Sequence, residues 1–303
     1  MKLTTYSVAS RLLVLTAVAV ALSGCGGGGT SPQPSGSGNL TGDAVKGPVA
    51  GATITAYAVS PNGTPGPMLG STVTDARGAF TVPIDGAGGP VLVRMNGGTY
   101  TDEATGATMS MGNSDAMTAA VPSVAAGASI TGVQITPLTS MAESMAEHMS
   151  GGLTNANVMA ANAAVGAYFM VDDIVYTRPM NPLLPASGST ATQSMMNYGM
   201  TLAAMSQYAK SAGMAQSSAL VTSMMADASD GVMDGMAGGN PIMMGSMTGS
   251  GMGGVAMRPD AGTIGLSDAM GSFLVSGFNM SGVTRTSMAG LMQHLAGSGG
   301  HVH

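Results

Sequence analysis

The chain has 303 residues, of which only 8% are charged, and its formal net charge is −6. A typical soluble protein has roughly 25% charged residues. So few basic side chains argue against nucleic-acid binding, which needs clusters of Lys and Arg to neutralise phosphates. The same scarcity removes most of the side chains that acid–base catalysis uses.

The first 24 residues have the parts of a secretory signal. Lys2 and Arg11 supply positive charge, and the apolar run LLVLTAVAVAL (residues 12–22) is too short to span a bilayer comfortably. The run leads into LSGC (residues 22–25), which resembles the lipobox of bacterial lipoproteins. The resemblance implies that Cys25 becomes the first residue of the mature chain and carries lipid on its sulfur and amine. An ordinary secretory signal with an incidental cysteine is the alternative.

Lipidation of Cys25 predicts a protein of the bacterial cell envelope whose first partner is the membrane. Two or more acyl chains give stable anchoring, whereas one gives marginal binding. Gram-negative lipoproteins carry an Asp after the cysteine as an inner-membrane retention signal. This chain has Gly26 there, so the resemblance implies the outer membrane. Residues 25–38 continue as a Gly-, Ser- and Pro-rich tether, which is expected to be flexible.

Residues 39–135 have the pattern of β-strands. ATITAYAV (residues 52–59) alternates small or apolar residues with Thr and Tyr at period two. Further strands are expected at residues 71–84, interrupted by a turn at 75–78, and at residues 90–95 and 129–135. Short strands at this spacing are typical of a β-sandwich.

Two stretches of this part resemble a known family. GDAVKGPVAGATITAYAV followed by TVTDARGAFTVPI resembles the carboxypeptidase regulatory-like, transthyretin-like β-sandwich, whose members share G-x-V-x-x-x-P-V-x-G-A-x-V and then T-D-x-x-G-x-F. The resemblance implies an accessory, stalk or ligand-binding module without catalytic residues. Some relatives bind glycans on exposed aromatic side chains. Tyr57 and Tyr100 are the aromatic residues available for this, and strand packing is the favoured explanation for both.

From residue 137 onward the period becomes helical. The first helix has an apolar stripe of Leu138, Met141, Met145 and Met149, and its other face carries Glu143 and Glu147. Thr154 is expected to cap the next helix. Helices are predicted at residues 155–170, 194–214, 218–229, 266–278 and 284–295. The full prediction is an α+β fold, in which an immunoglobulin- or transthyretin-like β-sandwich (39–135) is followed by a mostly α-helical, Met-rich domain (136–300).

The sequence lacks the common catalytic signatures. It has no G-x-S-x-G, no G-x-x-x-x-G-K and no H-E-x-x-H. Asp227, Asp230 and Asp234 do not have the spacing of an EF-hand loop, so a helix end is favoured over calcium binding. We therefore predict that the protein is not an enzyme.

The chain has 30 methionines, and we expect different roles for two groups of them. Those at helical positions, such as Met195 and Met205, are expected to pack in a core. A second group lies in the Gly-rich segment 231–262, where helical periodicity cannot account for it: Met233, Met236, Met243, Met244, Met247, Met252 and Met257. We expect this segment to lie outside the core and to be mobile.

Thioether sulfur suits Cu(I), so these loop methionines are candidate metal ligands. The imidazoles of His294, His301 and His303 suit Cu(II). A reservoir of oxidisable sulfur, an adhesive surface and compositional drift are the competing explanations. The leading functional prediction is a lipid-anchored binding or structural module with a protein or glycan ligand. The alternative is a periplasmic or surface Cu(I)- or Ag(I)-binding protein, for which Cu(I) would be the cofactor.

Overall fold

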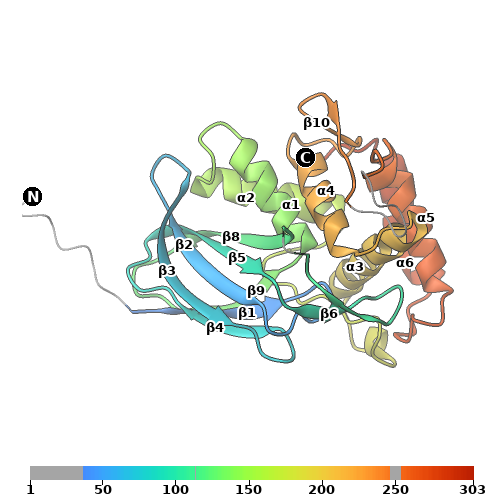
Figure 1. Ribbon diagram of the computed structural model, residues 1–303, viewed down its shortest axis with the longest axis horizontal. Coiled ribbons are helices and arrows are strands. Elements are labelled where there is room, and N and C mark those ends of the chain that lie inside the picture. Colours follow the sequence, from blue (N-terminus) through green and yellow to red (C-terminus); the bar gives the residue numbers. More distant parts are fainter. Residues whose placement is uncertain (1–36, 113, 246–253) are drawn as a thin grey trace, which may run out of the picture. The chain divides into compact units, whose positions relative to one another are not determined.

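Two β-sheets and a set of helices build the protein in the computed structural model, which describes residues 37–112, 114–245 and 254–303 (Figure 1). The first sheet has the order β4-β1-β9 and contains β1 (Asn39–Ala44), β4 (Ala79–Pro83) and β9 (Ile130–Ile135). The second has the order β3-β2-β5-β8 and contains β2 (Thr53–Val59), β3 (Pro65–Val73), β5 (Gly89–Asn96) and β8 (Ala116–Val124). A small hairpin consists of β6 (Thr99–Thr101) and β7 (Thr108–Ser110).

Alternating apolar side chains of the two sheets build the first part of the core. Leu40 of β1 lies opposite Val82 of β4, and Ile54 of β2 lies opposite Met95 of β5. All four side chains are fully buried. β1 and β9 run parallel, whereas every other neighbouring pair in these two sheets is antiparallel. The period-two pattern of the sequence therefore predicted β2, β4, β5 and β9 correctly.

The strand β8 was not predicted, and its burial explains why. Its sequence AMTAAVPSV shows no alternation, and the consecutive residues 117–121 are all buried, so both faces of the strand are covered. The helices α1 (Pro137–His148) and α2 (Asn155–Tyr168) pack on it. A strand covered on both faces reads as a continuous apolar run, which periodicity alone cannot identify. This packing also corrects the expectation for Glu143. Its side chain is buried rather than exposed, and its Oε2 accepts a hydrogen bond from Thr118 Oγ1 at 3.0 Å.

The remaining helices begin close to the predicted positions. They are α3 (Gln193–Ser211), α4 (Ser218–Ala228), α5 (Leu266–Leu274) and α6 (Arg285–Gly297), with a π-helical turn at Ala261–Gly265. Threonine hydroxyls cap α1, α2, α3 and α6 by accepting a backbone N–H of the first turn. The cap predicted at Thr154 is among them. In the described residues no helix is both long and apolar enough to cross a bilayer.

The described strands and helices belong to one compact unit and share one continuous core. The change from strands to helices falls at Thr136, which caps α1 directly after β9. The predicted α+β class is confirmed. The division into separate domains at residue 135 stays a prediction.

Candidate functional site

A cleft of about 620 Å³ lies between the turn after β1 and the segment that leads into α3. Val45 and Pro48 line one side, and Met180, Met195 and Leu202 line the other. Most of the lining side chains are apolar, with a few charged groups among them. Small-molecule sites in proteins span roughly 300–1,000 Å³ and have this kind of lining.

The helical wall of the cleft depends on a close backbone approach. A Cβ atom on Gly199 of α3 would overlap the carbonyl oxygen of Met180. The Met180 N–H donates to the carbonyl of Met195 at 3.0 Å, which fastens the segment to the helix. Pro179 and Pro182 keep this segment out of a helical conformation. Glycine at position 199 therefore lets residues 179–182 form a wall of the cleft.

Four charged side chains line the cleft: Asp43, Arg77, Glu103 and Arg178. Arg178 Nε lies 3.6 Å from Asp43 Oδ2, but the Arg178 side chain is 67% exposed. Such a surface ion pair contributes little, roughly 0–1 kcal/mol. Arg178 can therefore turn toward an anionic group in the cleft at small cost.

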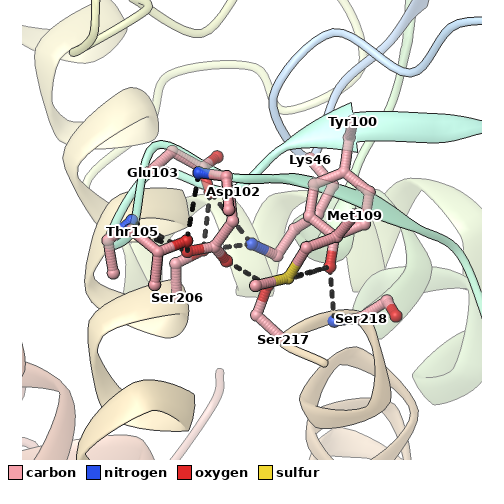
Figure 2. A network of polar contacts seen from close by, with 11 residues as sticks. Lys46, Tyr100, Asp102, Glu103, Thr105, Met109, Ser206, Ser217 and Ser218 are labelled. Atoms are coloured by element: carbon pink, nitrogen blue, oxygen red, sulfur yellow. Dashed lines mark hydrogen bonds and ion pairs between the residues drawn. The ribbon is translucent and has the colours of Figure 1, made fainter. Parts of the chain in front are cut away.

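Glu103 belongs to a buried polar network, which Figure 2 shows. Lys46 Nζ lies 3.1 Å from Glu103 Oε2, and it also donates to Ser206 Oγ. Ser206 Oγ donates to the same Glu103 oxygen at 2.5 Å. Lys46 is fully buried and Glu103 is 2% exposed. The network therefore joins the turn after β1, the turn between β6 and β7, and helix α3.

Asp102 and Tyr100 extend this network to the start of α4 (Figure 2). Ser217 Oγ donates to Asp102 Oδ2 at 2.5 Å and lies 3.1 Å from the Tyr100 hydroxyl. The backbone N–H of Ser218 donates to that hydroxyl at 3.2 Å. Asp102 Oδ1 accepts from the backbone N–H and the hydroxyl of Thr105. Tyr100 is thus a buried packing residue, as favoured over glycan binding.

The charges in the network stabilise one another. Burial alone would lower the pKa of Lys46, but the carboxylate of Glu103, with Tyr100 and Asp102, raises that pKa above its usual value. Burial alone would raise the pKa of Asp102, but Lys46 and the hydrogen bond from Ser217 lower it below its usual value. Lys46 and Asp102 are therefore both charged at neutral pH. The arrangement holds the cleft wall in place by fixed charges.

The sequence analysis did not single out this network. Lys46 and Glu103 lie in turns, where a charged side chain is ordinarily solvated. One signal in the sequence was the rarity of lysine. Lys46 and Lys210 are the only lysines after the predicted signal peptide. Both reach the same turn: Lys210 Nζ donates to the carbonyl of Ala104 at 2.8 Å.

The structure corrects the expectation that the Gly-rich segment 231–262 lies outside the core. Met233, Met244 and Met257 are 1%, 3% and 4% exposed and belong to the core. A Cβ atom on Gly262 would lie 2.6 Å from the Cβ of Met233, so glycine is what lets this methionine pack closely. The segment therefore builds core from methionine and glycine together, because an unbranched thioether fills irregular gaps.

Two further predicted methionine ligands, Met236 and Met243, are not core residues. Met243 is 58% exposed, and Met236 is half-buried on β10 (Met236–Ala237), which pairs with β11 (Asn240–Pro241). Met247 and Met252 lie outside the described residues, as does the predicted lipidation residue Cys25.

The three predicted histidine ligands are divided between two places. The rings of His301 and His303 stack at the C-terminus with centroids 5.3 Å apart, and both residues are exposed. The backbone of residues 300–302 pairs with residues 231–233. His294 is exposed on α6, with its ring 6.4 Å from the ring of Tyr168. Within the described ranges, no three His, Cys, Asp or Glu side chains come together as a metal site.

Comparisons with known proteins give little. No protein-family model matches the sequence, and no curated protein matches it. One solved structure with a match is the crystal structure of a 9R-lipoxygenase from Cyanothece PCC8801. The two chains are 12% identical, and the match covers 68% of this chain but only 26% of the lipoxygenase, with a TM-score of 0.22.

The match corrects one prediction made from the sequence. The absence of catalytic motifs led us to exclude enzymes, and that exclusion is withdrawn because the matching structure is an enzyme. A TM-score of 0.22 carries no argument about activity, so no lipoxygenase chemistry follows for this chain.

Proposed function

We propose that the protein is an envelope lipoprotein, anchored through Cys25, whose folded part is a binding module with the cleft as its ligand site. The observation that carries this proposal is the cleft itself, which has the volume and the mostly apolar lining of a small-molecule site. Arg77 and Arg178 line it and favour an anionic group on the ligand. The expected ligand therefore has an apolar body and an acidic group.

The finer identity of the β-part is included in the proposal. Residues 39–135 would be an immunoglobulin- or transthyretin-like sandwich of the carboxypeptidase regulatory-like type. The T-D-x-x-G-x-F residues support this, because they form the turn between β3 and β4. There the Asp75 carboxylate accepts from the N–H groups of Arg77 and Ala79 at 2.8 and 2.9 Å, and Gly78 has φ +80°. In relatives of this type the module serves as an accessory or ligand-binding unit.

The proposed location is the outer membrane. Residues 26–38 would act as a tether between the lipid on Cys25 and the folded body, and Gly26 stands where an inner-membrane retention signal would require Asp. The lipid anchor makes the membrane the first partner, while the cleft would take a soluble ligand.

The cleft is tested with 8-anilinonaphthalene-1-sulfonate, a fluorescent dye with apolar rings and one anionic group. Leu184 lines the cleft and is 55% exposed, so Leu184→Trp fills the cleft with little risk to folding. Val275, 80% exposed and outside the cleft lining, gives the matched control Val275→Trp. We expect Leu184→Trp to weaken dye binding about tenfold or more, because the larger side chain occupies space in the cleft that the dye would fill. A tenfold loss corresponds to roughly 1.4 kcal/mol of binding free energy. Val275→Trp should leave dye binding unchanged.

The arginines give an independent readout of the same site. Arg178→Ala should weaken dye binding, because it removes a cation beside the sulfonate, whereas Arg94→Ala on β5 should not. Melting curves in the absence of dye check that each variant is folded. Equal dye binding by the parent, Leu184→Trp and Arg178→Ala would refute the cleft as a ligand site.

A second candidate function is the binding of Cu(I) or Ag(I) by thioether and imidazole groups. The observation that favours it is the pairing of residues 300–302 with 231–233, which brings His301 and His303 to the methionine-rich segment. Metal analysis of the full chain, purified from cells grown with added copper, tests this function. A preparation without bound copper would refute it.

A further inference from the structure

The last turn of α1 carries methionine and histidine side chains on one face. Met145, His148 and Met149 stand at positions i, i+3 and i+4, which are neighbours on a helix surface. All three line one cavity, together with Ser229, Asp230 and residues 237–238 beyond α4. The Met145 methyl group reaches that second segment, since it would lie 3.7 Å from a Cβ atom on Gly231.

The hydrogen bond of His148 leaves one ring nitrogen free to act as a ligand. Its Nδ1 lies 2.8 Å from the carbonyl oxygen of Ser144. A carbonyl oxygen can only accept, so Nδ1 carries the proton and donates it. In the neutral ring the lone pair is then on Nε2. Metal-binding histidines commonly have this arrangement, in which a backbone carbonyl fixes the tautomer and the direction of the ring.

Core packing does not account for all three side chains. Met145 is half-buried and packs against the core. Met149 is the C-cap residue of α1 and does not belong to the core, although it is also half-buried. His148 is exposed. The cluster thus borders solvent, which gives an ion a path of entry, while both thioethers stay partly shielded from water.

We propose that Met145, His148 and Met149 form a binding site for Cu(I) or Ag(I). Two thioether sulfurs and one imidazole nitrogen are soft or borderline ligands, which suit these ions better than Mg²⁺ or Ca²⁺. Asp230 on the far side of the cavity could add an oxygen ligand to a harder ion, so Zn²⁺ is the competing occupant. Met145 and His148 lie in the last turn of α1, and Met149 is its C-cap residue. Sites on helices are more precisely held than sites on loops.

This site differs from the ligand set expected from the sequence. Three of the loop methionines, Met233, Met244 and Met257, are core residues, and their sulfurs would reach an ion only after local unfolding. The α1 site needs no unfolding. It shares no lining residue with the cleft, so it goes beyond the proposed ligand binding and gives the copper-binding candidate a defined position.

The test is a competition for Cu(I) between the full chain and bathocuproine disulfonate under reducing, anaerobic conditions. All variants carry Cys25→Ser, so that the thiol adds no copper binding. We expect the chain to bind one Cu(I) at this site, and Met149→Leu or His148→Asn each to weaken binding roughly 10–100-fold or more. The matched control is Met159→Leu, which replaces a 56% exposed methionine on the neighbouring helix α2. X-ray absorption of the copper complex should show both sulfur and nitrogen ligands.

Each outcome decides between the sites. Loss of Cu(I) binding in the α1 variants, with Met159→Leu unchanged, supports the proposal. Loss only in variants of Met236, Met243, His301 and His303 overturns it and assigns copper to the loop and C-terminus. Tighter binding of Zn²⁺ than of Cu(I) overturns the assignment of a soft metal. A parent chain without Cu(I) binding overturns both copper proposals, while the dye experiment on the cleft stays independent. Unchanged melting curves without metal show that any loss is not a loss of folding.

Discussion

Lys46 and Glu103 form an ion pair closed off from solvent, with 3.1 Å between Nζ and Oε2. Lys46 comes from the turn after β1, Glu103 from the turn between β6 and β7, and Ser206 of α3 contacts both. Burying two charges costs several kcal/mol per ion, which their mutual attraction offsets only with good geometry and further hydrogen bonds. We infer that the pair serves to fix the position of Glu103 beside the cleft.

The first prediction concerns this pair. Glu103→Gln leaves the Lys46 charge buried without its partner and should destabilise the protein by roughly 3–5 kcal/mol. The double variant Lys46→Met/Glu103→Leu removes both charges and should recover most of that loss. Urea denaturation of Lys46→Met, Glu103→Leu and the double variant gives the coupling energy. Lys210→Met is the control, because this exposed lysine of α3 donates to the Ala104 carbonyl of the same turn. Additive losses in the double variant would show that the pair is not coupled.

The second prediction concerns pH. Burial raises the pKa of Glu143 to about 7, with repulsion from Glu147 adding to the effect and the hydrogen bond from Thr118 opposing it. The unfolded chain has the ordinary value of 4.5, so the folded state holds the proton more tightly. Stability from this group is therefore full below about pH 4.5 and is lost as the pH rises to about 7. The loss should reach roughly 3 kcal/mol.

Glu143→Gln tests this pH dependence, because the amide keeps the shape and cannot ionise. Asp227 makes a similar contribution, since burial raises its pKa to about 7 while its Oδ1 accepts from the N–H groups of Asp234 and Gly235. Glu143→Gln should flatten part of the stability curve between pH 4.5 and 7, and Glu143→Gln/Asp227→Asn should flatten most of it. A parent curve that rises over this interval would contradict the prediction.

The sequence predicted the elements whose pattern is local. Period two identified β2 and β5. The cap at Thr154 placed the start of α2, and helical periodicity placed α3 close to its observed ends. It missed β8 because helices cover a face that would otherwise be polar. It also missed the Lys46–Glu103–Ser206 network, because those residues are 57 and 160 positions apart from Lys46 and meet only through tertiary packing. The cleft depends on the same long-range packing.

The third prediction compares two helical glycines. Gly199 of α3 contacts the backbone of Met180, whereas a Cβ atom on Gly290 of α6 would meet no atom within 4 Å. Gly199→Ala should therefore destabilise the protein and weaken dye binding in the cleft, because residues 179–182 must move. Gly290→Ala should stabilise it by roughly 0.5–1 kcal/mol, through the better helix propensity of alanine. Thermal denaturation measures both. Equal shifts of the same sign would contradict the close approach.

The fourth prediction concerns the anchor. If Cys25 carries lipid, Cys25→Ser should leave the precursor uncleaved or release the protein from the membrane, because the serine hydroxyl cannot take the thioether-linked lipid. Detergent phase partitioning of cell extracts measures the change. Ser23→Ala keeps a small residue before the cysteine and is the control. Unchanged partitioning of Cys25→Ser would exclude lipid anchoring at this residue.

The last prediction concerns the methionines of the Gly-rich segment. Because Met233, Met244 and Met257 are core residues, each change to Ala should cost roughly 2–5 kcal/mol, as for other buried Met-to-Ala changes. A change to Leu conserves volume and should cost less than about 1.5 kcal/mol. Met233→Leu should be the most costly of the three leucine variants, since a branch at Cγ must fit where the side chain packs closely on Gly262. Met243→Ala is the control, because that side chain is 58% exposed and its loss should change stability little. Equal stabilities of Met243→Ala and Met244→Ala would show that the segment lies outside the core after all.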